Sequence, residues 1–409
     1  MDLFYVIIGI VCFDFLLDRL LAGLNAKAWC QSLPSEISDI YSSEKFENHK
    51  QYRQTNYRFD WWHDSFGFIL ILFILIYRGF AIADSIVISF SEKPIVQGLL
   101  FFGLIGFLSL VIQIPFNWYH TFVVEEKYGF NKTSQKTFFV DILKSVLLGV
   151  LIGAPILSAV IWFYLLLGSS FWWVAWLLMG GFTLLMTMFY TSFILPLFNK
   201  QSPLESGDLR DAIEDFSIKA NFKLDNIFVM DGSKRSSKAN AFFSGLGSRK
   251  RIVLYDTLIN DLSTDEIVAV LAHEIGHYKL KHTLWGTVFG IIQTGVLLFI
   301  FSQVVDNHYL HEALGVAKPS FHIGMVAFGL LFSPVSMIIG LVGNWHSRKN
   351  EYAADRFAAN FRLSDPLISA LKKLSSNSLS NPTPHWLYVI FNYSHPPLLQ
   401  RMAALKSEK

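Results

Sequence analysis

Long apolar stretches constrain this chain more than any other feature of its sequence. A helix that crosses a bilayer needs roughly 20 mostly apolar residues. About seven stretches meet that length, and they lie at 3–24, 66–90, 98–117, 142–167, 171–196, 283–304 and 321–346. Only Gly168-Ser169-Ser170 separates two of them, which predicts a helical hairpin. We therefore expect an all-α integral membrane protein with about seven transmembrane helices.

The composition agrees with a lipid environment. Hydrophobic residues make up 52% of the 409 residues and charged residues only 16%, whereas a soluble domain carries about a quarter charged residues. The formal net charge of +2 argues against a nucleic-acid binder, which concentrates basic residues on one face. Membrane lipid is thus an expected partner, and nucleic acid is not.

Basic residues in the connections predict the orientation, because short loops rich in Lys and Arg stay in the cytoplasm. One set of connections holds most of them, including Lys127, Lys132, Lys136, Lys234, Arg235, Arg348 and Lys349. The opposite set contains little more than Lys93 and Lys318. This bias places the two long polar regions, 197–282 and 347–409, in the cytoplasm.

Several ionisable residues interrupt the apolar stretches. Asp14, Asp18 and Arg19 lie in the first stretch, and Arg78 and Asp84 lie in the second. Charged groups are costly in lipid, so they usually face one another or a wet cavity. The alternative is that they lie at helix ends and extend into the interface. A water-filled chamber would suit the first interpretation.

Neither polar region is large enough to bury much of a core alone. We therefore expect 197–282 and 347–409 to pack together as one domain, beside a membrane domain of residues 1–196 and 283–346.

Three kinds of element are predicted in the first polar region. Asp208–Ala220 has a helical pattern, and Asn226–Met230 and Arg251–Tyr255 predict short strands because they are rich in β-branched and aromatic residues. Ser263 followed three residues later by Glu266 is typical of a capped helix start.

The helix that starts there contains a His-Glu-x-x-His pattern. Positions i and i+4 share one helix face, so His273 and His277 can bind one ion, while Glu274 points to the side and can act as general base. Gly276 leaves room for close helix packing. By its spacing His282 lies beyond this site, and we interpret it as a helix-end or surface residue.

A catalytic zinc ion needs a third protein ligand and an open position. Glu351 and Asp355 are again four residues apart on a predicted helix, so one can bind the metal while the other accepts a hydrogen bond from a ligand imidazole. We assign Glu351 to the metal and Asp355 to the imidazole. The alternative is a buried pair of histidines without metal, which would leave costly buried polar groups.

Beyond this motif the sequence resembles the type I CAAX prenyl proteases, which are membrane zinc endopeptidases. The resemblance extends over nearly the whole chain and is carried by seven segments: Phe122–Lys132, Leu195–Lys200, Asp231–Gly245, Arg251–Leu258, His273–His282, Glu351–Asp355 and Ser394–Arg401. It implies seven helices around an intramembrane chamber, capped on the cytoplasmic side by a mostly helical zincin domain with a small β-sheet.

The resemblance also implies roles that spacing cannot assign. Asn240 and Ala241 would lie on an edge strand that binds the substrate backbone, as extended peptides do at sheet edges. His395 would belong to the catalytic residues, and Arg401 would contact the substrate or its developing oxyanion.

The expected function is therefore peptide-bond hydrolysis with one Zn²⁺ per chain, on a peptide or protein substrate for which the family implies a prenylated C-terminus. A membrane quality-control protease acting on non-prenylated substrates is the alternative, since it would use the same catalytic residues. A transporter or receptor with a structural zinc fits less well, because structural zinc has four protein ligands. The expected compartment is the endoplasmic reticulum or a bacterial inner membrane.

Overall fold

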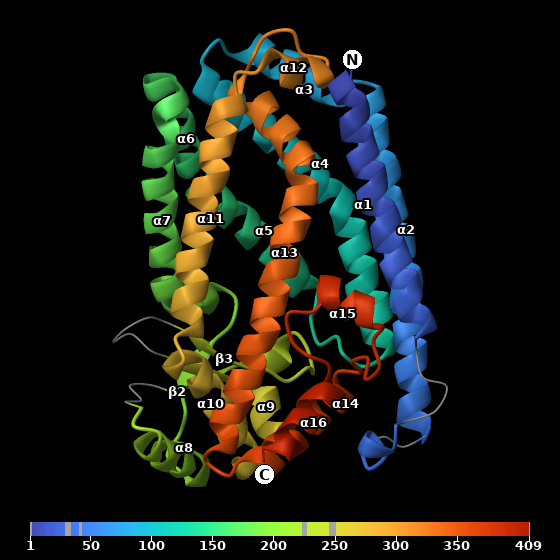
Figure 1. Cartoon of the computed structure of the whole chain (residues 1–409), viewed down its shortest axis with the longest axis vertical. Coiled ribbons are helices and arrows are strands. Elements are labelled where there is room, and N and C mark those ends of the chain that lie inside the picture. The colour runs from blue at the N-terminus through green and yellow to red at the C-terminus, as the bar shows by residue number, and fades with distance from the viewer. Residues whose placement is uncertain (1, 29–33, 41–42, 223–226, 245–250, 409) are drawn as a thin grey trace.

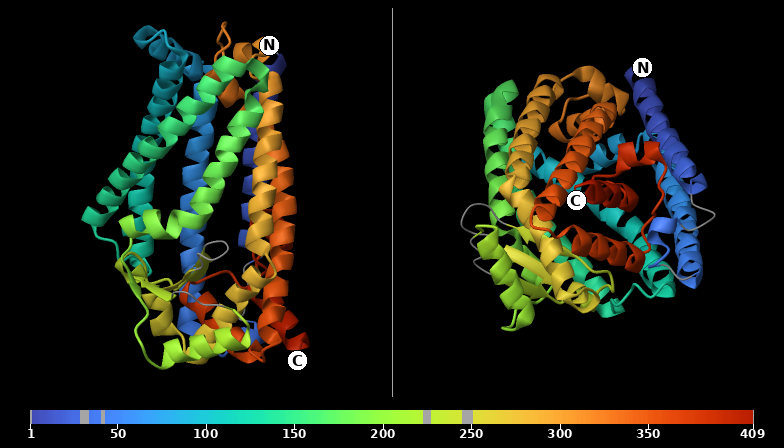
Figure 2. Two further views of the ribbon diagram at one scale, coloured as in Figure 1. Left: turned by 90° about the vertical axis from the view of Figure 1, so that its left-hand side faces the viewer. Right: turned by 60° about the horizontal axis from the view of Figure 1, so that its bottom comes forward.

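The computed structural model describes residues 2–28, 34–40, 43–222, 227–244 and 251–408. Long helices run side by side between two ends of the molecule (Figure 1). The N-terminus lies at one end and the C-terminus at the other, where a small sheet and several shorter helices gather (Figures 1 and 2). We refer to the second end as the polar end.

The bundle and the end opposite the polar end are built from ten helices among the described residues: α1 (Asp2–Lys27), α2 (Ser43–Ile76), α3 (Gly79–Phe90), α4 (Pro94–Tyr119), α5 (Gln135–Leu148), α6 (Ala154–Leu167), α7 (Phe171–Phe189), α11 (His282–Val304), α12 (His308–Ala313) and α13 (Phe321–Ala359). The predicted hairpin is confirmed, because α6 and α7 pack against each other across the turn Gly168–Ser170.

Five stretches of the described chain are long and apolar enough to cross a membrane: Glu44–Ile76, Pro94–Glu125, Gln135–Leu197, His282–Val304 and Phe321–Ala359. Helix α1 has 26 residues but carries Asp14, Asp18 and Arg19. The predicted span 66–90 is wrong, because the helix is interrupted where Arg78 adopts a left-handed conformation with φ of 55°. Helix α2 ends before this break, and α3 is a separate short helix.

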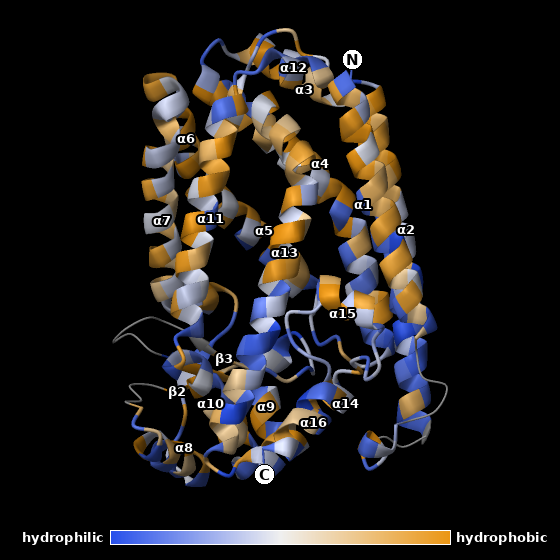
Figure 3. Ribbon diagram, viewed as in Figure 1, coloured by the Kyte–Doolittle hydropathy of each residue, from blue (hydrophilic) through white to orange (hydrophobic). Residues whose placement is uncertain are grey.

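The outer surface of the bundle is apolar over most of its length. Large side chains such as Leu151, Trp285 and Ile338 are exposed, and hydrophobic residues cover the long helices while hydrophilic residues gather at the polar end (Figure 3). Such a surface requires lipid, since large exposed apolar patches are rare on soluble monomers. The protein is therefore an integral, multi-pass membrane protein.

Ionisable residues within the bundle contact partners on other helices. Arg19 on α1 pairs with Asp64 on α2, and Asp14 on α1 accepts a hydrogen bond from Ser333 on α13. Asp84 and His322 are both buried, with Oδ1 and Nε2 2.7 Å apart. These contacts agree with the interpretation in which the charged residues face one another.

The sheet at the polar end has four strands among the described residues: β1 (Gln201–Pro203), β2 (Ile227–Met230), β3 (Ala241–Ser244) and β4 (Arg251–Tyr255). Their order is β1-β2-β4-β3, with β2 and β4 parallel and the other two pairs antiparallel. Both predicted strands are confirmed within the described residues, which exclude Asn226. Strand β3 forms one edge of the sheet.

Six helices accompany the sheet in the described chain: α8 (Asp208–Lys219), α9 (Asp256–Asp261), α10 (Thr264–Lys279), α14 (Ser364–Asn377), α15 (Trp386–Asn392) and α16 (Leu398–Ser407). The two polar regions share one hydrophobic core, in which Ile213, Leu254 and Leu271 lie with Leu367 and Met402. Both regions are therefore needed to build this end of the molecule.

Helix α10 packs closely on the last turns of α13. It begins with the predicted capping box, since Ser263 and Glu266 exchange hydrogen bonds between side chain and backbone. At Gly276, an added Cβ would lie 3.2 Å from the Cα of Ala354. The glycine thus permits the close approach of the two helices that carry the predicted metal ligands.

Candidate metal centre

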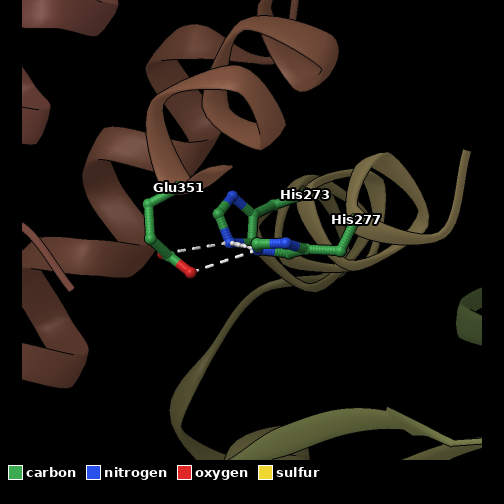
Figure 4. A group of neighbouring side chains, drawn as sticks. All are labelled: His273, His277 and Glu351. Carbon is green, nitrogen blue, oxygen red and sulfur yellow. Dashed lines mark hydrogen bonds and ion pairs between the residues drawn. The ribbon is translucent and has the colours of Figure 1, made fainter. Parts of the chain in front are cut away.

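Two helices bring the three predicted ligands together (Figure 4). The Nε2 atoms of His273 and His277 on α10 are 3.1 Å apart. The carboxylate of Glu351 on α13 lies 3.5 Å from Nε2 of His273 and 3.2 Å from Nε2 of His277. Among the described residues, this is the group of His, Cys, Asp and Glu side chains whose donor atoms come close enough to share an ion.

The cluster fits a bound cation on two grounds. Oε2 of Glu351 is buried without a hydrogen-bond partner, and two imidazole Nε2 atoms that face each other at 3.1 Å would repel through their lone pairs. A tetrahedral zinc ion with Zn–N bonds of about 2.0–2.1 Å holds two nitrogens about 3.3 Å apart. The residue types and their spacing therefore fit one zinc ion.

Asp355 and Arg401 lie behind His273. Nδ1 of His273 is 2.8 Å from Oδ1 of Asp355, so the neutral ring with its proton on Nδ1 donates it there and presents its Nε2 lone pair to the metal position. Arg401 donates two hydrogen bonds to the same carboxylate, from Nε at 2.9 Å and Nη2 at 2.6 Å. The Arg401 side chain is only 10% exposed. It contacts the carboxylates of Asp355 and Glu351 and the ring of His273.

The carboxylates also set the electrostatics of His273. Burial alone lowers the pKa of this imidazole, but hydrogen bonds to Asp355 and Glu351 outweigh burial and raise the pKa to about 9. A surrounding that increases the affinity of a ring nitrogen for a proton also favours a metal cation at that nitrogen, since both are positive charges.

His282 holds the second imidazole, and the sequence analysis missed this role. Nδ1 of His282 lies 3.0 Å from Nδ1 of His277. If His277 donates this proton, its Nε2 lone pair faces the metal position. On a continuous helix, residues five apart do not share a face. Here Lys281 adopts a left-handed conformation with φ of 59°, which ends α10 and returns His282 toward His277.

Replacing His282 by alanine is expected to weaken zinc binding about 10- to 100-fold, because partners that orient a ligand imidazole contribute at that level. Competition with a chelator of known affinity would measure the change. His308→Ala is the matched control, since His308 is an exposed histidine at the far end of the bundle. An unchanged zinc affinity in His282→Ala would contradict the assignment.

Glu274 and His395 lie at the accessible side of the cluster. Glu274 is partly buried between the two histidines on α10, and it has no ion pair or hydrogen bond with the described residues. His395, from the segment between α15 and α16, is 66% exposed in its side chain, and its Nε2 lies 3.3 Å from Oε1 of Glu351. Both side chains are therefore available to a bound ligand.

Asn240 and Ala241 lie where the sheet edge begins. Ala241 is the first residue of β3, and Asn240 is exposed directly before it. The Asn240 carbonyl accepts a hydrogen bond from Tyr255 N on β4. Strand β3 pairs with β4 on one side only among the described residues, so its outer edge can pair with an extended peptide.

A lipid-facing helical bundle and a His-Glu-x-x-His helix completed by a glutamate from a second helix define an integral-membrane metalloendopeptidase. Two family models cover almost the entire chain. CAAX prenyl protease N-terminal, five membrane helices, matches residues 25–200, and Peptidase family M48 matches residues 203–409. The chain belongs to the CAAX prenyl proteases of peptidase family M48, a metal-dependent family.

Individual relatives agree over most of their lengths. A CAAX prenyl protease 1 homolog of Oryza sativa subsp. japonica is 36% identical over 388 residues, which cover 92% of this chain and 90% of the relative. CAAX prenyl protease 1 of Saccharomyces cerevisiae is 33% identical over 399 residues, covering 91% and 88%. The crystal structure of S. mikatae Ste24p matches with a TM-score of 0.94 at 32% identity and covers 99% of both chains.

Proposed function

We propose that the protein is a zinc endopeptidase that cleaves prenylated CAAX C-termini. The observation that carries the proposal is the convergence of His273, His277 and Glu351, with donor atoms within 4.8 Å of one another, in a chain whose relatives are named for this activity. Zinc held by these three residues would lower the pKa of a water molecule and polarise the scissile carbonyl.

The residues around the metal position have separate tasks in this proposal. Glu274 takes a proton from the attacking water and passes it to the leaving amine. His395, exposed beside Glu351, donates a hydrogen bond to the developing oxyanion. Asp355 fixes the orientation of His273, and Arg401 fixes Asp355 through its two hydrogen bonds. We also propose that Arg401 contacts the bound substrate.

The substrate binds in extended form in this proposal. Asn240 and Ala241 lie at the start of β3, and backbone N–H and C=O groups of a peptide can add a strand at the outer edge of β3. Strand β3 lies close to α10, which carries two of the metal ligands. A peptide paired there would place its scissile bond near the metal position.

We further propose seven spans around a chamber, with α2 in place of the span 66–90. The domain of residues 197–282 and 347–409 lies in the cytoplasm in this proposal, and residues 1–196 and 283–346 lie in the membrane. Cavities between the helices support a hollow interior. One of about 1000 Å³ lies between α4, α5 and α6, and one of about 540 Å³ lies between α1 and α13. In this proposal the protein lies in the endoplasmic reticulum membrane or a bacterial inner membrane, with its polar end in the cytoplasm.

Proteolysis of a matched pair of peptides tests the function. One peptide carries a farnesyl group on its C-terminal CAAX cysteine, and the other has the same sequence without it. We expect the purified zinc-loaded protein to cleave the farnesylated peptide alone, and a zinc chelator to stop the reaction.

Equal cleavage of both peptides would favour a quality-control protease acting on non-prenylated substrates. Cleavage of neither peptide by the zinc-loaded protein would contradict the proposed function.

A further inference from the structure

Three side chains from distant segments meet beside the sheet. They are Tyr52 on α2, Glu125 at the end of a π-helical segment that continues α4, and Lys238 in the loop before β3. Nζ of Lys238 donates to Oε2 of Glu125 at 2.7 Å and to the Tyr52 hydroxyl at 3.1 Å. The Tyr52 hydroxyl donates to Oε1 of Glu125 at 2.6 Å. We call these three residues the Lys238 cluster.

Two of the three side chains in the Lys238 cluster are largely buried, while that of Lys238 is 35% exposed. The side chain of Glu125 is 14% exposed, and Tyr52 is buried. The ammonium group of Lys238 also lies 4.4 Å from the centre of the Phe130 ring, within the range of a cation–π contact. A charge-assisted bond to a largely buried carboxylate is stronger than an ion pair between two exposed groups.

Backbone contacts hold the same loop against the membrane helices. Lys132 N donates to the Arg235 carbonyl at 3.0 Å, and Ser237 N donates to the Phe130 carbonyl at 3.1 Å. The guanidinium of Arg235 donates twice to Asp141 on α5, at 2.7 and 2.9 Å. The loop from Arg235 to Lys238 is thus attached to the connection between α4 and α5.

This loop leads directly into the edge strand. Strand β3 begins at Ala241, three positions after Lys238, and the Lys238 carbonyl accepts a hydrogen bond from the Thr257 hydroxyl at 3.2 Å. The Lys238 side chain therefore fixes the start of β3 relative to the membrane helices, while its backbone fixes the same point relative to α9. None of the three clustered side chains is part of the metal centre.

We infer that Lys238, Glu125 and Tyr52 are positioning residues for substrate binding, because their cluster holds the start of edge strand β3 in a fixed position relative to the membrane helices. The inference rests on the proposed function, in which β3 pairs with the substrate backbone. A peptide that extends from the helical bundle to the metal position must contact the membrane helices and strand β3 at the same time. Loosening the cluster would cost affinity for the peptide and leave the metal centre intact.

Kinetics with the farnesylated peptide test the inference. Lys238→Met and Glu125→Gln are each expected to raise KM about tenfold, as expected for loss of a charge-assisted hydrogen bond, with kcat changed less than about twofold. The double variant should show the same increase as either single variant, since both remove one interaction. Lys238→Arg should recover much of the affinity. Lys136→Met, at an exposed position on α5, is the matched control.

Direct binding measurements distinguish the positioning role of the Lys238 cluster from the proposed peptidase function. The dissociation constant of the uncleaved peptide is measured in a Glu274→Gln background, with zinc content and melting temperature as controls. Unchanged KM and dissociation constants, or additive effects in the double variant, would overturn the inference while wild-type cleavage still supports the proposed function. Loss of zinc or of folding in both single variants would also overturn it, by showing a structural role. Absence of cleavage by the wild type contradicts the proposed function itself.

Discussion

Replacing Glu274 by glutamine should lower kcat about 10³- to 10⁴-fold, the upper range for removal of a general acid–base group. Glutamine has nearly the same shape but cannot accept the proton of the attacking water. Zinc content should stay at one ion per chain, because Glu274 is not among the three residues whose donor atoms converge. Rates with the farnesylated peptide and elemental analysis of the purified variant measure both outcomes.

Glu214→Gln provides the matched control for this prediction. Glu214 is an exposed residue on α8 that pairs with Arg210 one helical turn away, and its substitution should leave kcat and zinc content unchanged. Cleavage at the wild-type rate by Glu274→Gln would exclude Glu274 as the base. Loss of zinc from that variant would instead assign Glu274 to the metal shell.

Removal of the third ligand should have a different signature. We expect Glu351→Gln to weaken zinc binding by more than about 100-fold, since even residues that only orient a ligand contribute 10- to 100-fold. The substitution removes the negative charge that lies within 3.5 Å of both imidazoles. Activity should fall with the zinc content and return in part when excess zinc is supplied. Competition with a chelator measures the affinity.

Glu312→Gln on α12 is the control for Glu351→Gln, because Glu312 is exposed at the opposite end of the bundle. Zinc affinity equal to that of the wild type in Glu351→Gln would show that a different residue completes the site. Lost zinc binding together with a collapsed melting temperature would indicate that Glu351 supports the fold as well as the ion.

Local sequence patterns predict those parts of the structure that depend on residues close together in the chain, such as one helix face or one helical hairpin. The helix that carries His273 and His277 is predicted by the His-Glu-x-x-His pattern and by Ser263 and Glu266, whose capping box is present in the structure. Glu351 was predicted as its partner because a zinc site needs a third ligand. The roles of these residues in catalysis remain predictions.

Two interruptions of helices were not predicted, and they have the same physical cause. Arg78 and Lys281 both adopt left-handed backbone conformations, with φ of 55° and 59°. Glycine and asparagine usually occupy such positions, so a basic residue there gives no signal in the sequence. The first break divides the expected span 66–90, and the second brings His282 to His277.

Contacts between distant segments were also beyond the sequence analysis. Lys238 lies 113 positions from Glu125 and 186 from Tyr52. No spacing rule connects residues that far apart, and a lysine in a polar loop normally faces solvent. The bidentate contact between Arg401 and Asp355 was missed for the same reason, since it joins residues 46 positions apart on different helices.

Helix α13 extends without interruption over 39 residues, from Phe321 at the far end of the bundle to the turns that carry Glu351. At 1.5 Å per residue, about 45 Å separate Phe321 from Glu351. A rigid tilt of the helix by one degree about its far end would displace the ligand carboxylate by about 0.8 Å. Packing against neighbouring helices sets the tilt of a membrane helix, so the contacts of α13 with α1, α4 and α11 help to determine where Glu351 lies.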